Sequence, residues 1–192
     1  MITNINCIRR VRPVAQNIDG LARVEPYIQE AEKLNILPQI GAHLYQWFDG
    51  LGPAITEAQT YTREDGTEVS VSPQQYEAIM FGGYFDGACC SGTGHSMGLV
   101  NAVAYYAYSR MILDNQISVT SFGVVRKRSD YSDQLDYASI SRASSEAKQI
   151  ADECAREVVA HLQSLGLLGC CHRAKRVKKF QAINSCKRYE LD

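Results

Sequence analysis

The stretch MGLVNAVAYYAYSRMIL, residues Met97–Leu113, decides the fold class. Almost every position in it is apolar or aromatic, so a helix formed here is hydrophobic on most sides. Such a helix must be covered by neighbouring elements over most of its surface. Its 17 residues extend about 25 Å as a helix, close to the width of a small domain. The sequence therefore predicts a central buried helix around which the rest of the chain packs.

Further helices are predicted on both sides of this segment. Between Ser139 and Leu165 apolar residues recur every third or fourth position, and Gly166 follows as a stop signal. Leu21–Ala31 has the same spacing, and a second early helix is expected over Leu37–Phe48. Two amphipathic helices this close in sequence are expected to form an antiparallel or steeply crossed pair.

The remaining segments have turn and strand character. Asp65-Gly66 is a strong turn signal, and it predicts a hairpin over residues 58–71. Ser72-Pro73 then predicts a capped helix that ends near Phe81. A long loop over 115–136 contains the β-prone run Ile117–Arg128, and residues 1–20, with three arginines and a turn signal, are interpreted as an extended arm.

Taken together, these patterns predict a mainly α protein. We expect a helical bundle of about five helices with a β-hairpin, a long β-prone loop and extended termini. No internal repeat and no second core is evident in the sequence. The expected organisation is an arm over residues 1–20, one helical domain over 21–168 and a basic tail over 169–192.

Composition excludes several classes of protein. The 192 residues carry 20 basic and 21 acidic side chains, a net charge of −1 that gives no global attraction to nucleic acid or anionic membrane. No apolar run reaches the roughly 18 residues of a membrane span, and the opening MITNINCIRRVRP lacks the apolar core of a secretory signal. From Gly169 onward, however, seven bases face two acids, a net of +5. This charge indicates either an anionic partner for the tail or a flexible end that the bases keep solvated.

A glycine-rich stretch, Gly87–Ser96, raises two catalytic hypotheses, and neither is favoured. A phosphate-binding loop, GxxxxGK[ST], needs a lysine directly after its second glycine; here Thr93 follows Gly92, and no lysine lies from Phe81 to Ser109. A nucleophile–base–orienter set is also conceivable from Cys89 or Cys90 with His95 and Asp86. Since cysteines among glycines beside a core helix more often pack as small hydrophobic groups, we interpret the stretch as a connection and expect no enzyme activity.

Seven cysteines without an export signal favour reduced thiols over a disulfide framework. Four potential zinc ligands lie in the tail: Cys170, Cys171, His172 and Cys186. Adjacent cysteines lack the usual C-x₂₋₄-C spacing and rarely both reach one ion, so these are weak candidates and no cofactor is expected. His43 and His161 are interpreted as hydrogen-bonded or edge histidines of helices.

Three longer phrases of the sequence resemble one family. They are IRRVRPVAQNIDGLARVEPYIQEAEKLNILPQIG (Ile8–Gly41), YEAIMFGGYFDG (Tyr76–Gly87) and GLVNAVAYYAYSRMILDNQISVTSFGVV (Gly98–Val125), followed by the serine-rich helix. In these phrases the chain is similar to the head–tail connector, or ring, proteins of crAss-like tailed bacteriophages. The likeness covers about residues 8–165, and the tail after Gly169 is the part that matches least.

This resemblance implies a structural protein of the virion neck, with host cytoplasm as its location during assembly. Proteins of that kind are helical adaptors that form rings, commonly of twelve copies, between the portal and the tail. The implied partners are other copies of the chain, the portal protein, other connector or tail proteins, and genomic DNA that passes through the channel without sequence-specific contacts. No membrane partner and no catalytic residues are implied.

Basic residues are the candidates for contacts with a partner or with channel DNA. They lie in the arm, in the long loop and in the tail: Arg9, Arg10, Arg12, Arg126, Lys127, Arg128, Arg173, Lys175, Arg176, Lys178 and Lys179. An acidic protein partner is as plausible as DNA, because many phosphate contacts would make a channel grip its cargo. The alternative function is a zinc-binding, nucleic-acid-associated protein that uses the basic Cys/His tail.

Overall fold

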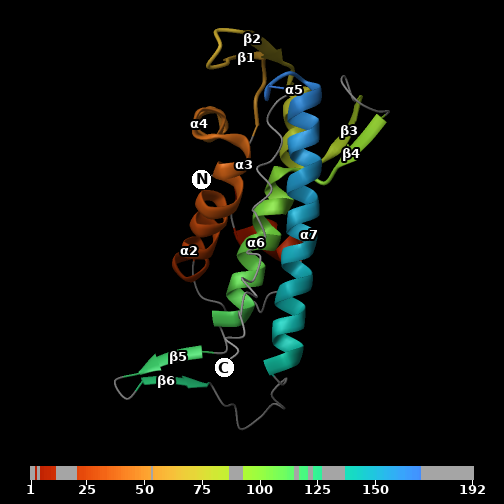
Figure 1. Ribbon diagram of the computed structural model, residues 1–192. Coiled ribbons are helices and arrows are strands. Elements are labelled where there is room, and N and C mark those ends of the chain that lie inside the picture. Colours follow the sequence, from red (N-terminus) through yellow and green to blue (C-terminus); the bar gives the residue numbers. More distant parts are fainter. Residues whose placement is uncertain are drawn as a thin grey trace, which may run out of the picture.

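A computed structural model describes residues 3, 5–11, 21–52, 54–86, 93–114, 117–120, 123–126 and 137–169. As expected, the described chain is mainly helical (Figure 1). Its helices stand side by side, and three two-stranded antiparallel sheets lie at or near the two ends of this helical body. The elements form one core, whose buried side chains come from helices near both ends of the sequence.

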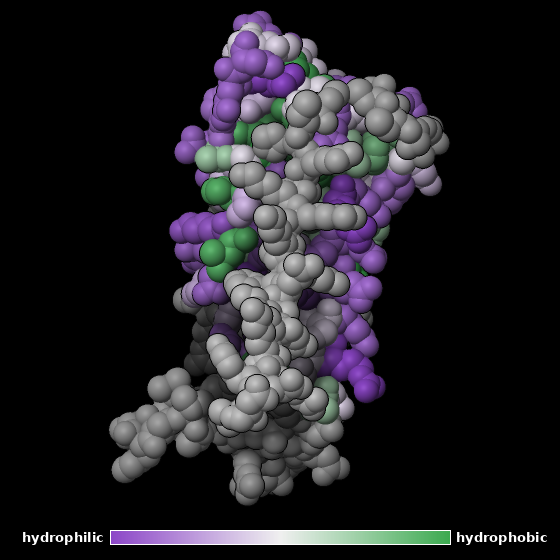
Figure 2. All heavy atoms as spheres, viewed as in Figure 1, coloured by the Kyte–Doolittle hydropathy of each residue, from purple (hydrophilic) through white to green (hydrophobic). Residues whose placement is uncertain are grey.

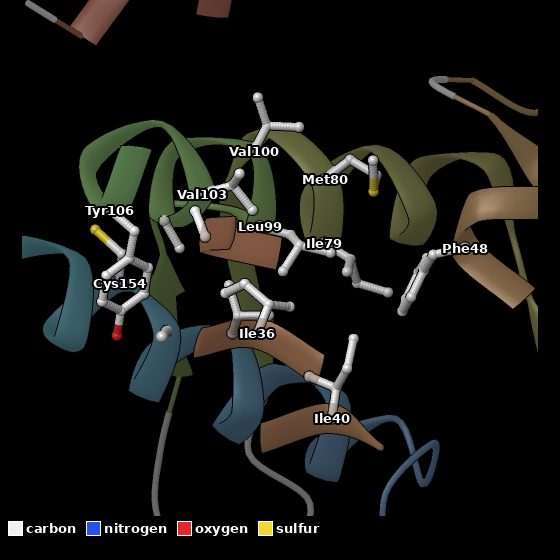
Figure 3. Close-up of a cluster of buried hydrophobic side chains, with 14 of the residues drawn as sticks. Ile36, Ile40, Phe48, Ile79, Met80, Leu99, Val100, Val103, Tyr106 and Cys154 are labelled. Carbon is white, nitrogen blue, oxygen red and sulfur yellow. The ribbon is translucent and has the colours of Figure 1, made fainter. Parts of the chain in front are cut away.

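The predicted central helix is confirmed as α6 (Leu99–Asp114), which packs along most of its length against α7 (Tyr137–Ser164). Both ends and the middle of α6 are buried, including Leu99, Tyr106 and Met111. On α7 the facing positions include small residues such as Ala151, which let the two helix backbones approach closely. Figure 3 shows part of the core, in which side chains of α6 and α7 gather with residues of α5 (Pro73–Phe81), η1 (Glu32–Ile36), α3 (Leu37–Ile40) and α4 (Ala42–Leu51).

The last long helix ends where the sequence predicts. α7 has 28 residues and therefore extends about 42 Å. Beyond it the amides of Leu167 and Leu168 both donate to the carbonyl of Leu162, at 3.0 and 3.3 Å. Gly166, with φ 75°, makes the left-handed step that such a helix end requires.

The early helices differ from the expectation. α2 (Leu21–Ala31) continues through a π-helical turn, η1 (Glu32–Ile36), into α3 (Leu37–Ile40), and α4 (Ala42–Leu51) begins only after Gly41. The expected boundary of the helix pair, between Ala31 and Leu37, is therefore wrong, and so is a single helix over Leu37–Phe48. The break falls at Gly41 because its φ of 85° is a conformation that side chains disfavour.

The N-terminal segment is also corrected. Residues Ile5–Val11 form a short helix, α1, that packs against α6. Ile8 is fully buried in the core, while Arg9 and Arg10 are exposed. An extended arm is thus wrong for this part of residues 1–20. Residues 12–20 lie outside the described part.

The hairpin predicted over residues 58–71 is confirmed as β1 (Gln59–Thr62) and β2 (Glu68–Val71), with Gly66 in the turn at φ 82°. The capped helix after it is confirmed as α5 (Pro73–Phe81): Ser72 and Gln75 form a reciprocal capping box. The β-prone loop over 115–136 contains a hairpin, β5 (Ile117–Thr120) and β6 (Gly123–Arg126). The sequence analysis missed the hairpin of β3 (Gly83–Asp86) and β4 (Thr93–Ser96).

Candidate assembly surface

Three glycines allow the β3–β4 hairpin to lie tightly against the helical body. A Cβ atom on Gly82 would lie 2.8 Å from the carbonyl oxygen of Ser96, and one on Gly98 would lie 2.4 Å from the amide nitrogen of Gly82. Both glycines have positive φ, 104° and 89°. The segments that enter and leave the hairpin therefore run side by side in direct backbone contact, with Phe81 and Met97 next to the two glycines at the base of the hairpin.

One face of the hairpin is fixed to α7. The ring of Phe85 stacks on the imidazole of His161, which is 2% exposed. Gly94 on the paired strand leaves the room for this ring, because a Cβ there would lie 2.5 Å from Phe85 Cζ. The amide of Met97 donates to Glu157 Oε2 at 3.1 Å, which adds a second link to α7.

The opposite face of the hairpin presents hydrophobic side chains to solvent. Tyr84 is 81% exposed and contacts the exposed imidazole of His95, its partner across the strands, edge to face with ring centroids 5.0 Å apart. At the base, Phe81 and Met97 are 39% and 40% exposed. We call Phe81, Tyr84, His95 and Met97 the hairpin surface. A rigidly held apolar surface of this kind is typical of an interaction site.

A fourth exposed hydrophobic residue lies apart from the hairpin, on the π-helical turn. Leu34 is 64% exposed and follows the exposed Lys33. The amide of Leu37 donates to the carbonyl of Glu32, five residues back, which is the hydrogen bond that defines a π turn. Leu34, Phe81, Tyr84 and Met97 are the large hydrophobic side chains that the described residues expose. On the face drawn in Figure 2, hydrophobic residues likewise surface in small areas among hydrophilic ones.

A buried carboxylate stabilises this π turn. Glu32 is buried and accepts hydrogen bonds from the Thr3 amide at 3.2 Å and from the Tyr45 hydroxyl at 2.7 Å. Burial and the bond to Glu32 raise the pKa of Tyr45, so its hydroxyl stays a donor. These two hydrogen bonds link the turn to the N-terminal segment and to α4. They therefore hold the backbone that carries the exposed Leu34 in place.

A hollow of about 320 Å³ lies between the start of α4, the β1–β2 turn and the segment after α7. Four of its polar side chains are paired: His43 Nδ1 and the Tyr61 hydroxyl are 3.1 Å apart in a hydrogen bond, and Arg63 forms a 2.9 Å ion pair with Asp65. Glu64 also lines the hollow.

Cys154 is buried on α7, and burial raises the pKa of its thiol to about 11, which leaves it protonated and unreactive at neutral pH. Within the described residues, no three His, Cys, Asp or Glu side chains gather in a way that could hold a metal ion. Nor does any helix in that part of the chain have the length and apolar character needed to cross a membrane.

Residues 61–165, more than half of the chain, match the family DUF6712, which is described as a family of unknown function. The chain belongs to the DUF6712 family. No curated protein and no solved structure gives a significant match. The DUF6712 region begins in β1 and ends just after α7, so it contains the whole hairpin surface and the α6–α7 pair, whereas Leu34 lies outside it.

The structure describes only some of the candidate site residues. In this DUF6712 protein Arg9 and Arg10 lie exposed on α1, and Arg126 ends β6. His95 pairs with Tyr84 across β3–β4, and Asp86 is exposed at the end of β3. The other candidates lie outside the described residues: Arg12, Cys89, Cys90, Lys127, Arg128, Cys170, Cys171, His172, Arg173, Lys175, Arg176, Lys178, Lys179 and Cys186.

The sequence analysis missed Tyr84, Phe81 and Met97 as surface residues. A weak signal was present: in Gly83-Tyr84-Phe85-Asp86 one aromatic ring follows another, so a strand here must direct one ring inward and one outward. The neighbouring glycines obscured this signal. A glycine-rich stretch indicates a loop unless the close backbone contacts that require glycine are known.

Proposed function

We propose that this protein is a structural subunit of a ring in the neck of a tailed bacteriophage, where it joins the portal to the tail and extends the DNA channel. The resemblance of the sequence to connector proteins suggests this role. The observation that carries it is the hairpin surface: Tyr84 is 81% exposed on a hairpin whose other face is fixed to α7. Such a rigid, apolar surface favours stable contact with another protein over catalysis.

The architecture suits a ring. A ring needs each copy to present two different surfaces, one for each neighbour. Obligate assemblies commonly bury more than about 2,000 Å², and hairpins that project from a helical body increase the area one copy can offer. In Figure 1 the β5–β6 hairpin extends from the end of the body opposite β1–β2, so separate hairpins are available for the layers above and below.

Channel DNA would meet this ring only through non-specific charge contacts. Arg9 and Arg10 are exposed on α1 and offer two such positive groups in each copy. The basic tail after Gly169 is proposed as a further contact with DNA. The competing proposal is that this tail binds an acidic protein partner. DNA binding by the purified ring that weakens with salt, and that is lost when residues 170–192 are removed, supports DNA. Ring formation without DNA binding supports the acidic protein partner.

The test of the function is to locate the chain in the particle. We expect cryo-electron microscopy of purified virions, or of the protein incubated with its portal, to show a ring of about twelve copies in the neck. The described helical body should fit the density of each copy. A virion that lacks the chain by mass spectrometry, or a neck without density for it, would falsify the proposal. So would a reaction catalysed by the purified protein.

A further inference from the structure

We infer that the hairpin surface of one copy docks against the π-helical turn of the next copy, with Tyr84 beside Leu34 and Asp86 beside Lys33. This inference rests on the proposed ring and names the two surfaces that join its subunits. The occupant of the hairpin surface is therefore a second copy of this chain, in a head-to-tail arrangement.

The positions of the two surfaces support a head-to-tail contact. In Figure 1 the β3–β4 hairpin extends from one side of the α6–α7 pair, and the run from α2 to α3, which contains the π turn, lies on the other side. The two surfaces therefore cannot cover each other within one copy. Together they contain the large hydrophobic side chains that the described residues expose: Leu34, Phe81, Tyr84 and Met97. A contact between different surfaces repeats from copy to copy, and it forms a ring when the rotation from one copy to the next closes the circle.

The charges beside these hydrophobic groups are complementary. Asp86 lies two residues after Tyr84, so both side chains leave the same face of β3. Lys33 directly precedes Leu34, and both are exposed. Neither Asp86 nor Lys33 forms an ion pair with another described residue. An apolar contact flanked by one carboxylate and one ammonium group selects the orientation in which opposite charges meet.

The two surfaces also differ in the kind of side chain that they offer, as the two sides of a stable contact do. The hairpin surface offers flat rings, Tyr84 and His95, with Phe81 and Met97 at its base. The π turn offers one branched aliphatic side chain on a helical segment whose base is fixed by the buried Glu32. Tyrosine is among the residues that most often carry binding energy at interfaces, and both surfaces are already ordered before they meet, which reduces the entropic cost of association.

Charge reversal tests the pairing. We expect Asp86→Lys and Lys33→Glu each to weaken self-association about tenfold or more, measured by sedimentation velocity with the portal protein present and absent. The double variant, which restores opposite charges, is expected to recover most of that loss. Glu146→Lys and Lys148→Glu make the same charge changes at exposed positions of α7 and should leave association unchanged. Single variants that associate as well as the wild type, or a double variant without recovery, overturn the pairing.

Photo-crosslinking tests the contact even where association is weak. Tyr84→p-benzoylphenylalanine places a photoreactive ring at the centre of the hairpin surface. After irradiation we expect a product of twice the chain mass, joined to a peptide that contains Leu34. The same group at Ala143, an exposed position on α7, should not give this product. No product at any concentration, with or without portal, or products joined only elsewhere, overturn the inference.

The two proposals fail in different ways. Rings in the virion neck with crosslinks from position 84 to another region would overturn the contact and leave the proposed function intact. Crosslinks to the Leu34 peptide from a chain that is absent from the neck would support the contact and overturn the proposed function.

Discussion

Phe85 and His161 stack face to face, with ring centroids 4.6 Å apart and ring planes 10° from parallel. His161 is 2% exposed, and its Nδ1 atom has no hydrogen-bond partner in the described part of the chain. A positive charge on this buried imidazole would be poorly solvated. Burial accordingly lowers the pKa of His161 to about 4. At neutral pH the imidazole that stacks on Phe85 is therefore uncharged.

This stack predicts a loss of stability in mild acid. The folded-state pKa of His161, about 4, lies below its ordinary value of 6.5, so the unfolded chain takes up a proton first as the pH falls. The contribution of His161 is fully present above about pH 7 and is lost as the pH falls from 6.5 toward 4. We expect the free energy of unfolding to decrease by on the order of 2 kcal/mol over this range, measured by denaturant titration.

His161→Phe provides the control for that prediction, because phenylalanine keeps an aromatic stack and cannot be protonated. In this variant, the free energy of unfolding should no longer show the decrease between pH 6.5 and 4 that His161 causes. An unchanged pH dependence would show that other groups are responsible.

Gly94→Ala should displace the hairpin. The added methyl group would lie 2.5 Å from the Phe85 ring, so the ring must move, and we expect a cost of about 1–3 kcal/mol. With the stack loosened, water reaches His161, and its pKa should rise toward 6.5 in an NMR titration.

Gly50→Ala is the matched control for Gly94→Ala. Gly50 lies in α4, and a Cβ there meets nothing within 4 Å. Since alanine favours helix more than glycine does, this variant should be as stable as the wild type or more stable by about 0.5–1 kcal/mol. A Gly94→Ala protein with wild-type stability and an unshifted His161 would contradict the structure of the hairpin base.

Ile8→Ala should destabilise the whole body. Ile8 is fully buried against the core, and truncation of such a side chain costs about 2–5 kcal/mol. Arg10→Ala, at an exposed position of the same helix, should change stability by less than about 0.5 kcal/mol. Thermal unfolding measures both. Equal effects of the two variants would mean that α1 does not pack as described.

Ser72→Ala should remove half of the capping box at the start of α5. The Ser72 hydroxyl accepts from the Gln75 amide at 3.3 Å, and the Gln75 side chain accepts from the Ser72 amide at 2.9 Å. Loss of such a cap costs about 1 kcal/mol, which chemical denaturation can resolve. Ser70→Ala, at an exposed position of β2, is the control and should be close to neutral.

The elements that the sequence predicted correctly are those with strong local signals. Each of these signals can be recognised from residues close together in the sequence. They are the apolar run of α6, the three-to-four-residue repeat of α7, the Asp65-Gly66 turn and the Ser72-Pro73 cap. Their structure follows from helix periodicity and turn chemistry, which require no knowledge of distant partners.

The elements that were missed depend on contacts between distant residues. α1 is short, and its helix is stabilised by the burial of Ile8 against α6. The β3–β4 hairpin requires Gly82 and Gly98 because two backbone segments touch there, and a sequence shows the glycines without the contact. The exposed rings of the hairpin surface could not be predicted for the same reason: which of Tyr84 and Phe85 faces outward is decided by His161, 76 positions after Phe85.

The π-helical turn has a consequence for how this protein diversifies. A π turn contains one residue more than the α-helical turn that it replaces. Loss of a single codon within Glu32–Ile36 would therefore let α2 and α3 continue as a regular α-helix, with Val24, Ile28 and Ile40 still facing the core. The exposed Leu34 would then occupy a different position on the helix surface. On the proposed contact between Tyr84 and Leu34, gain or loss of one codon would thus change which subunits recognise one another, without redesign of the interior.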